Sequence, residues 1–254
     1  MTKDVVSVDK DARLQDVLDT MVKQRVSKLV VLDKGQIVGV LTDGDIADEL
    51  GAIKNRGVPA THLHASSAMR RKFPSVAPDT EARALLEAFV EQEAQILPVL
   101  HDRQVLGVVT GSDLLSLVQS ATPLADVMTA SHLQVVAPSD RVIHARRMML
   151  DHGIERLPVL EHGALVGILG ELDIAVGLAR FKGTVADHHQ AAAIQRFLVQ
   201  EVCQRTVVTA TPETTARDAV ALMRKNDVGA LPVLRGERLV GICTRSDLLR
   251  LIGR

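Results

Sequence analysis

Apolar and polar positions follow two rhythms along the chain. Short apolar stretches, such as residues 29–32 and 97–100, lead through turn residues into a second apolar stretch, which predicts two strands joined by a tight hairpin. Before each hairpin, apolar residues recur at the i, i+3, i+4 and i+7 spacing of an amphipathic helix. After it, a polar stretch leads into another apolar face, as in "GICTRSDLL" at 241–249. The pattern predicts the order β-α-β-β-α, with the first strand at "VVSV", "FPSV", "LQVV" or "VVTA".

This order occurs four times. "GICTRSDLL" recurs as "GVLTDGDIA" at 39–47, "GVVTGSDLL" at 107–115 and "GILGELDIA" at 167–175. Twelve residues before the Thr of each segment, or before Gly170 in the third, stand Val30, Pro98, Pro158 and Pro232. Because proline has no N–H to donate to a strand ladder, we expect it in an edge strand or at the start of a strand.

The predicted fold class is a mixed α/β fold of four repeats. One repeat is too small to bury its sheet face alone, so we expect pairs to form the stable unit. Two tandem modules follow, at about 1–120 and 121–254, with repeats at about 1–52, 66–120, 121–180 and 200–254.

Composition narrows the function classes. The 254 residues carry 30 basic and 31 acidic side chains, with no Trp or Tyr and four Phe, which argues against a dedicated nucleic-acid binder. The one local basic run is at 70–72. Cys203 and Cys243 lack metal-ligand spacing, and we expect both to be reduced. With no signal-like segment and no long apolar run, we expect a cytoplasmic chain.

The polar segment between the last strand and the last helix allows two interpretations. T-x-x-D before an apolar run is a capping box, in which Thr244 starts a helix and Asp247 reaches back. Gly170 is also a tolerated cap. The alternative is a ligand site, for two reasons. The Asp occurs in all four copies, and a glycine always stands three residues before the Thr, or before Gly170 in the third copy. Glycine within a strand often marks a close approach of ligand or backbone. Lys28 and Arg156 stand at equivalent positions in their repeats, and Arg245 follows Thr244. Cations therefore stand near a helix N-terminus that could bind an anion.

These shared positions resemble the CBS motif, and the paired form resembles a Bateman module. The "DVMT" segment at 126–129 is also typical of that family, and Met1-Thr2 is similar to it. The resemblance covers nearly the whole chain. It implies a regulatory module that binds an adenosine compound, such as AMP, ADP, ATP or S-adenosylmethionine, in the cleft between two repeats. It implies no catalytic residues, no required cofactor and no metal.

The resemblance also implies roles for individual residues. Those implied to lie at the ribose are Thr42, Asp45, Thr110, Asp113, Asp173, Thr244 and Asp247. Those implied to lie near the base are Ser7, Ser75 and Thr209, with Gly39, Gly107, Gly167 and Gly241. Those implied to meet phosphate are Lys28, Arg156 and Arg245.

The copies depart from the family pattern unequally. The third has Gly170 and Val135 where hydroxyl residues are expected, so we expect its ribose site to fail. Ile96 and Ala230 replace the cations in the second and fourth copies. We expect the Asp247 site to be the best, with Arg156 and Arg245 within reach of phosphate.

The sequence leaves three functions open. The first is a non-enzymatic adenosine-nucleotide sensor, expected to be a homodimer and to act on a separate effector protein. The second is an interaction scaffold in which T-x-x-D serves only as a cap, and the third is nucleic-acid association through residues 70–72. Asp187-His188-His189 resembles a metal signature of some phosphoesterases, but it stands in a short connector without the further motifs that those enzymes need.

Overall fold

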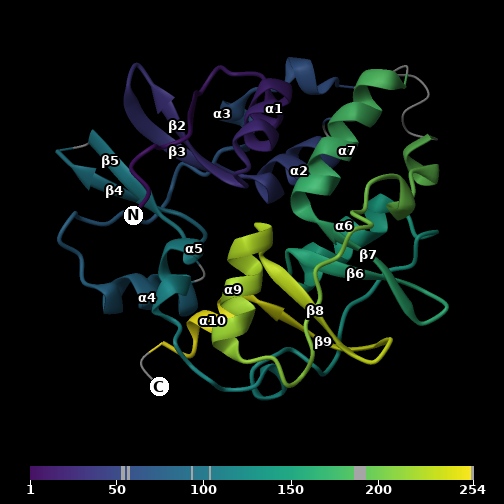
Figure 1. Cartoon of the computed structure of the whole chain (residues 1–254). Helices are drawn as coiled ribbons and strands as arrows, with labels where there is room; N and C mark the ends of the chain where they lie inside the picture. Colours follow the sequence, from purple (N-terminus) through teal and green to yellow (C-terminus); the bar gives the residue numbers. More distant parts are fainter. Residues whose placement is uncertain (53–54, 56–57, 93, 103, 186–192, 253–254) are drawn as a thin grey trace.

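The computed structural model describes residues 1–52, 55, 58–92, 94–102, 104–185 and 193–252. Four repeats surround a common centre (Figure 1). Repeat 1 comprises β1 (Ser7–Asp9), α1 (Leu14–Gln24), β2 (Lys28–Asp33), β3 (Gln36–Thr42) and α2 (Asp43–Gly51). Repeat 2 comprises α4 (Ala82–Val90), β4 (Leu97–His101), β5 (Gln104–Val109) and α5 (Gly111–Leu114). Repeat 3 comprises α6 (Val142–His152), β6 (Arg156–Glu161), β7 (Ala164–Gly170) and α7 (Glu171–Thr184). Repeat 4 comprises α9 (Ala216–Asn226), β8 (Ala230–Arg235), β9 (Arg238–Thr244) and α10 (Arg245–Leu249).

The mixed α/β fold class of four repeats is confirmed, with one difference at the first strand. Only repeat 1 forms it as a strand, β1, parallel to β2. In the other three repeats it is reduced to a single parallel bridge: Val76 with Val99, Val136 with Val159 and Ala210 with Val233. Val30 shows why repeat 1 lacks the proline. Its N–H donates to the carbonyl oxygen of Val6 at 3.2 Å, and proline has no N–H to donate.

The four predicted hairpins form as antiparallel strand pairs. Each has a register shift directly after the Pro-Val or Val-Val pair, as between Val159 and Leu160. Three of the turns place glycine at positive φ, at Gly35, Gly163 and Gly236, where a side chain would be strained. β6 and β8 are the two edge strands of the four-stranded sheet β6-β7-β9-β8, as expected for strands that contain proline.

Linkers cross between neighbouring repeats. The segment before repeat 1 bridges repeat 2 through Thr2 and Val108, and the segment before repeat 2 bridges repeat 1 through Arg70 and Val40. Repeats 3 and 4 make the same exchange, Thr129 with Ile242 and Gln204 with Ile168. Repeats 1 and 2 are therefore interlocked by their own linkers, as are repeats 3 and 4.

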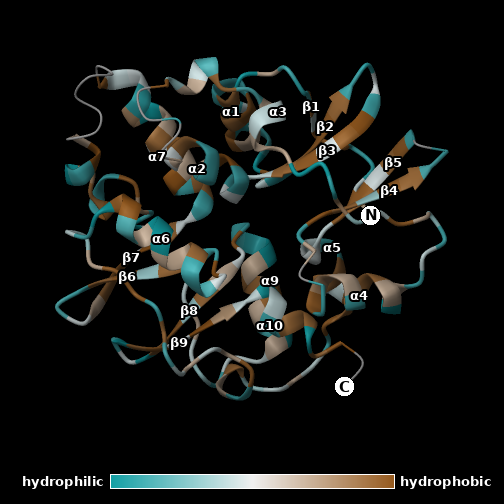
Figure 2. Ribbon diagram, turned by 180° about the vertical axis from the view of Figure 1, so that it is seen from behind, coloured by the Kyte–Doolittle hydropathy of each residue, from teal (hydrophilic) through white to brown (hydrophobic). Residues whose placement is uncertain are grey.

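The cores join repeats from opposite halves of the chain. One core cluster combines repeats 1 and 3, where α2 packs against α7, and a second combines repeats 2 and 4, where α10 contacts α5 and α4. A smaller cluster of Val30, Val40, Ile96 and Val108 joins repeats 1 and 2. Figure 2 shows hydrophobic residues concentrated in strands such as β3, β4 and β9. The four repeats thus close on each other within one chain, and the N-termini of α2, α5, α7 and α10 all reach the centre.

The connector before repeat 4 differs from its siblings. Helix α7 continues to Thr184, so it has 14 residues against nine in α2. Asp187, His188 and His189 lie outside the described residues. Among the helices that the structure describes, none is long and apolar enough to cross a bilayer.

Candidate functional site

A cavity of about 2310 Å³ lies where the four repeats meet, and we call it the central cavity. The first residue of each closing helix lines it: Asp43 of α2, Gly111 of α5, Glu171 of α7 and Arg245 of α10. A second lining position directly precedes Lys28, Ile96, Arg156 or Ala230 in its repeat. It is occupied by Ser27, Gln95, Glu155 and Gly229. Because both positions recur, each repeat contributes two residues to the lining of one shared space.

The cations that line the central cavity include Lys28, Arg70, Arg156 and Arg245. The predicted phosphate residues Lys28, Arg156 and Arg245 are therefore brought together from repeats 1, 3 and 4. Burial and the positive charge of Arg156 lower the pKa of Arg245. Two like charges that face one cavity repel each other, and an anion bound between them would be stabilised.

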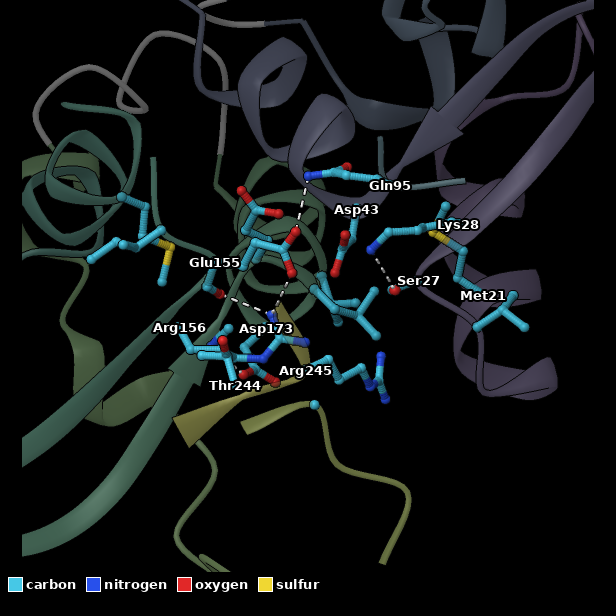
Figure 3. A pocket seen from close by; sticks show the side chains of 18 of the residues that line it. Met21, Ser27, Lys28, Asp43, Gln95, Glu155, Arg156, Asp173, Thr244 and Arg245 are labelled. Carbon is cyan, nitrogen blue, oxygen red and sulfur yellow. Dashed lines mark hydrogen bonds and ion pairs between the residues drawn. The ribbon is translucent and has the colours of Figure 1, made fainter. Parts of the chain in front are cut away.

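Glu155 is the carboxylate that these cations surround. Its Oε1 accepts a hydrogen bond from Nε2 of Gln95 at 2.9 Å, and Arg156 Nη1 lies 3.9 Å from its Oε2. Burial alone would raise the pKa of Glu155, but Lys28, Arg156, Arg245 and Arg70 outweigh it and lower the pKa. Figure 3 shows the side chains of Lys28, Gln95, Glu155 and Arg156 turned toward the same region. Glu155 is therefore ionised and acts as an internal counter-ion.

Two further carboxylates stand at the meeting N-termini of α2 and α7. Asp43 is 2% exposed, and burial raises its pKa despite the nearby Lys28 and Arg156. Its Oδ1 accepts from the Gly44 N–H at 3.1 Å, whereas its buried Oδ2 has no hydrogen-bond partner among the described residues. Burial, followed by the charges of Asp43 and Glu155, raises the pKa of Glu171 to about 8.

Capping boxes form at the strand-to-helix corners. In every copy, Oδ2 of the aspartate accepts from the backbone N–H of the residue three positions before it. The distance is 2.9 Å for Asp45, and 2.8 Å for Asp113, Asp173 and Asp247. Thr42, Thr110 and Thr244 also donate their hydroxyls to that oxygen. The aspartate half of the capping box is therefore present in each repeat. The other oxygen, Oδ1, determines what else the corner can bind.

The crossing linkers reach Oδ1 in three of the four copies. Arg70 Nε donates to Asp45 at 2.7 Å, Thr2 Oγ1 to Asp113 at 3.2 Å and Gln204 Nε2 to Asp173 at 2.9 Å. In the fourth copy, Arg250 Nη1 lies 3.5 Å from Oδ1 of Asp247, a long and weak contact. Asp247 is therefore the aspartate whose second oxygen is least committed to the protein.

Gly170 stands where its siblings have threonine. A Cβ at this position would meet the Arg156 side chain, with Cδ at 3.3 Å. Arg156 thus takes the space of the missing hydroxyl side chain. Burial raises the pKa of Asp173, against the hydrogen bonds from Gln204 and the Gly170 N–H.

The predicted site residues divide into two groups. Those that line the central cavity are Lys28, Thr110, Arg156, Asp173, Thr244, Arg245 and Asp247. Those that do not are Ser7, Gly39, Thr42, Asp45, Ser75, Gly107, Asp113, Gly167, Thr209 and Gly241.

The four glycines have a structural reason for their identity. A Cβ on Gly107 would lie 2.8 Å from the carbonyl oxygen of Thr2, and one on Gly167 would lie 2.9 Å from that of Gln204. A Cβ on Gly39 would clash with the Met69 side chain, and one on Gly241 would clash with that of Met128. Each glycine therefore lets a crossing linker approach, whereas a role of these glycines near a base stays a prediction.

Sequence reasoning missed Asp43, Glu155, Glu171 and Gln95. The sequence did contain a signal for two of them. Asp43 and Glu171 occupy, in their repeats, the position that Arg245 occupies in repeat 4, and Arg245 was predicted to meet phosphate. Among the described residues, no three His, Cys, Asp or Glu side chains lie close enough to hold a metal ion by themselves. The residues as they stand make a mixed cluster of cations and carboxylates, suited to an ionic ligand.

The chain belongs to the CBS-domain family, whose model matches residues 1–52, 65–120, 124–180 and 199–254. It is similar to protein MJ1225 of Methanocaldococcus jannaschii, with 25% identity covering 98% of this chain and 95% of the relative. The crystal structure of MJ1225 matches with a TM-score of 0.83, covering 98% of this chain and 96% of that one. A protein from Pyrococcus horikoshii shares the fold at 20% identity, with a TM-score of 0.61 covering 99% and 97% of the two chains.

Proposed function

We propose that this chain is a regulatory module that binds an adenosine nucleotide in the central cavity, on the side formed by repeats 3 and 4. Asp247 and Thr244 are proposed to meet the ribose, and Arg156 and Arg245 the phosphate. The observation that carries the proposal is this set of four residues, which line one cavity from two neighbouring repeats.

The state of Asp247 supports this choice of site. Its Oδ2 completes the helix cap, and its Oδ1 has the long contact with Arg250. A ribose diol could donate to Oδ1 without breaking the cap. At Asp45, Asp113 and Asp173, a ribose would first have to displace a linker side chain. That cost supports unequal occupancy, with Asp247 filled before the others.

The mechanism follows from the location of the cavity. A ligand between repeats binds one relative arrangement better than another, and so shifts the population toward it. The identity of the compound among AMP, ADP, ATP and S-adenosylmethionine, a homodimer and a separate effector protein all stay predictions.

Thermal unfolding tests the proposal directly. A ligand that binds only the folded state should stabilise it by about 2.7 kcal/mol at a hundredfold excess over Kd. We expect at least one of the four compounds to raise Tm, and Asp247→Ala to remove the shift. If no adenosine compound changes Tm, the sensor proposal is wrong.

A second function, an interaction scaffold, is favoured by one observation, the capping interactions in all four copies. On that account Asp247→Ala lowers stability by about 1 kcal/mol, the usual loss for a cap, and does so equally with and without ligand. The same titration therefore separates the two functions.

A further inference from the structure

The surroundings differ among three of the carboxylates that line the central cavity, Asp43, Glu155 and Glu171. Glu155 is satisfied by Gln95 and by the surrounding cations. Asp43 keeps a buried oxygen, Oδ2, without a hydrogen-bond partner among the described residues. A buried carboxylate oxygen without a partner is costly. Asp43 and Glu171 therefore call for an explanation of their own.

Asp43 and Glu171 meet at one point, the N-terminus of α2. The Asp43 carboxylate accepts from the Gly44 N–H at 3.1 Å. A Cβ on Gly44 would lie 2.6 Å from Oε2 of Glu171. Gly44 therefore leaves just enough room for the Glu171 carboxylate, and the two acids approach each other from repeats 1 and 3.

Cations face the same space. Lys28 and Arg156 both act on Asp43 and on Glu171 electrostatically. Cations and carboxylates in one cavity suit a ligand that carries both signs of charge. A phosphate chain with a bound divalent metal ion is such a ligand, since Lys and Arg take phosphate oxygens and carboxylates take the metal.

We propose that the central cavity binds the magnesium complex of a nucleoside di- or triphosphate, with Asp43 and Glu171 as the two protein ligands of the metal. The proposal rests on the proposed function, because the phosphate chain completes the site. Mg²⁺ is usually held by one or two carboxylates together with substrate phosphates, and dedicated all-protein cages for it are rare. The lack of a three-residue metal cluster among the described residues therefore agrees with this assignment. Asp43 Oδ2 gains its partner only when metal and phosphate are both present.

Calorimetric titration of the full chain with ATP, in magnesium and in excess EDTA, tests the proposal. We expect magnesium to tighten ATP binding by about tenfold or more. Loss of a single outer-shell partner of a metal already lowers metal affinity by about that factor. Asp43→Asn should abolish that gain. The matched control is Asp102→Asn on the β4–β5 hairpin, where the side chain is 90% exposed, and it should keep the gain.

Each other outcome overturns the proposal. If ATP binds equally well with and without magnesium, the metal site is wrong and the nucleotide site stands. If Asp43→Asn tightens ATP binding equally in both conditions, Asp43 only repels phosphate. If ATP binds in neither condition while AMP binds, the metal site alone fails, and if no adenosine compound binds, the proposed function fails with it.

A second measurement needs no variant and so does not depend on how Asp43→Asn folds. Electron paramagnetic resonance of Mn²⁺ with ATP should change when the unmodified chain is added, at one metal per bound ATP. A Mn²⁺–ATP spectrum unaffected by the protein would overturn the proposal.

Discussion

Replacing Glu171 by Gln should change how the stability of the protein depends on pH. The ordinary pKa of 4.5 for this carboxyl is raised to about 8 in the folded chain, mainly by burial and then by Asp43 and Glu155. Between these two values the folded state holds a proton that the unfolded state has released. Stability from this group is therefore fully present below pH 4.5 and is lost as pH rises toward 8.

The magnitude follows from proton linkage. Each pH unit in that window changes the free energy of unfolding by about 1.4 kcal/mol, so from about pH 5 to about pH 8 the limit is about 4 kcal/mol. Glu171 is partly exposed to the cavity, and solvent screening reduces the effect to about 2 kcal/mol. For a chain of this size that corresponds to about 4–8 °C in Tm.

Urea or thermal unfolding, followed by circular dichroism at several pH values, provides the assay. We expect Glu171→Gln to match the parent chain near pH 5 and to be more stable by that amount near pH 8. Glu161→Gln, at an exposed position beside the β6–β7 turn, is the control and should follow the parent curve. Parallel curves for Glu171→Gln and the parent would refute the reasoning, since they would show that no proton is held at Glu171.

Two substitutions test the backbone contacts that shape the repeats. Val30→Pro removes the N–H that donates to Val6, and chemical denaturation should show a loss of about 1–3 kcal/mol; no loss would show that this bond does not explain the missing proline. Gly107→Ala brings a Cβ within 2.8 Å of the Thr2 carbonyl oxygen and should cost about 1–3 kcal/mol in the same assay. The control Gly183→Ala, in α7 with nothing within 4 Å of the added Cβ, should stabilise by about 0.5–1 kcal/mol, and equal effects at both glycines would contradict the linker explanation.

The periodic part of the fold was predictable from sequence because it depends on local patterns. Hairpins, amphipathic helices and the shared register gave four repeats, and Thr244 with Asp247 forms the expected capping box. Val30 stands where the other three copies have proline. Its hydrogen bond to Val6 supplies the reason, which lies in strand pairing and is not visible in spacing.

The site was less predictable because its geometry depends on contacts between repeats. The partners of Asp45 and Asp173, Arg70 and Gln204, come from linkers that cross to the neighbouring repeat. A single repeat carries no information on that crossing. The burial that raises the pKa of Glu171 likewise arises only when α7 meets α2.

The most direct test of the central claim is calorimetric titration of AMP, ADP and ATP into the parent chain, Asp247→Ala and Arg245→Gln. The account predicts saturable binding of at least one nucleotide to the parent, loss of binding in Asp247→Ala, and a larger loss for Arg245→Gln with nucleotide than with adenosine. Binding that neither substitution changes would contradict the site, and the absence of nucleotide binding to the parent chain would contradict the function.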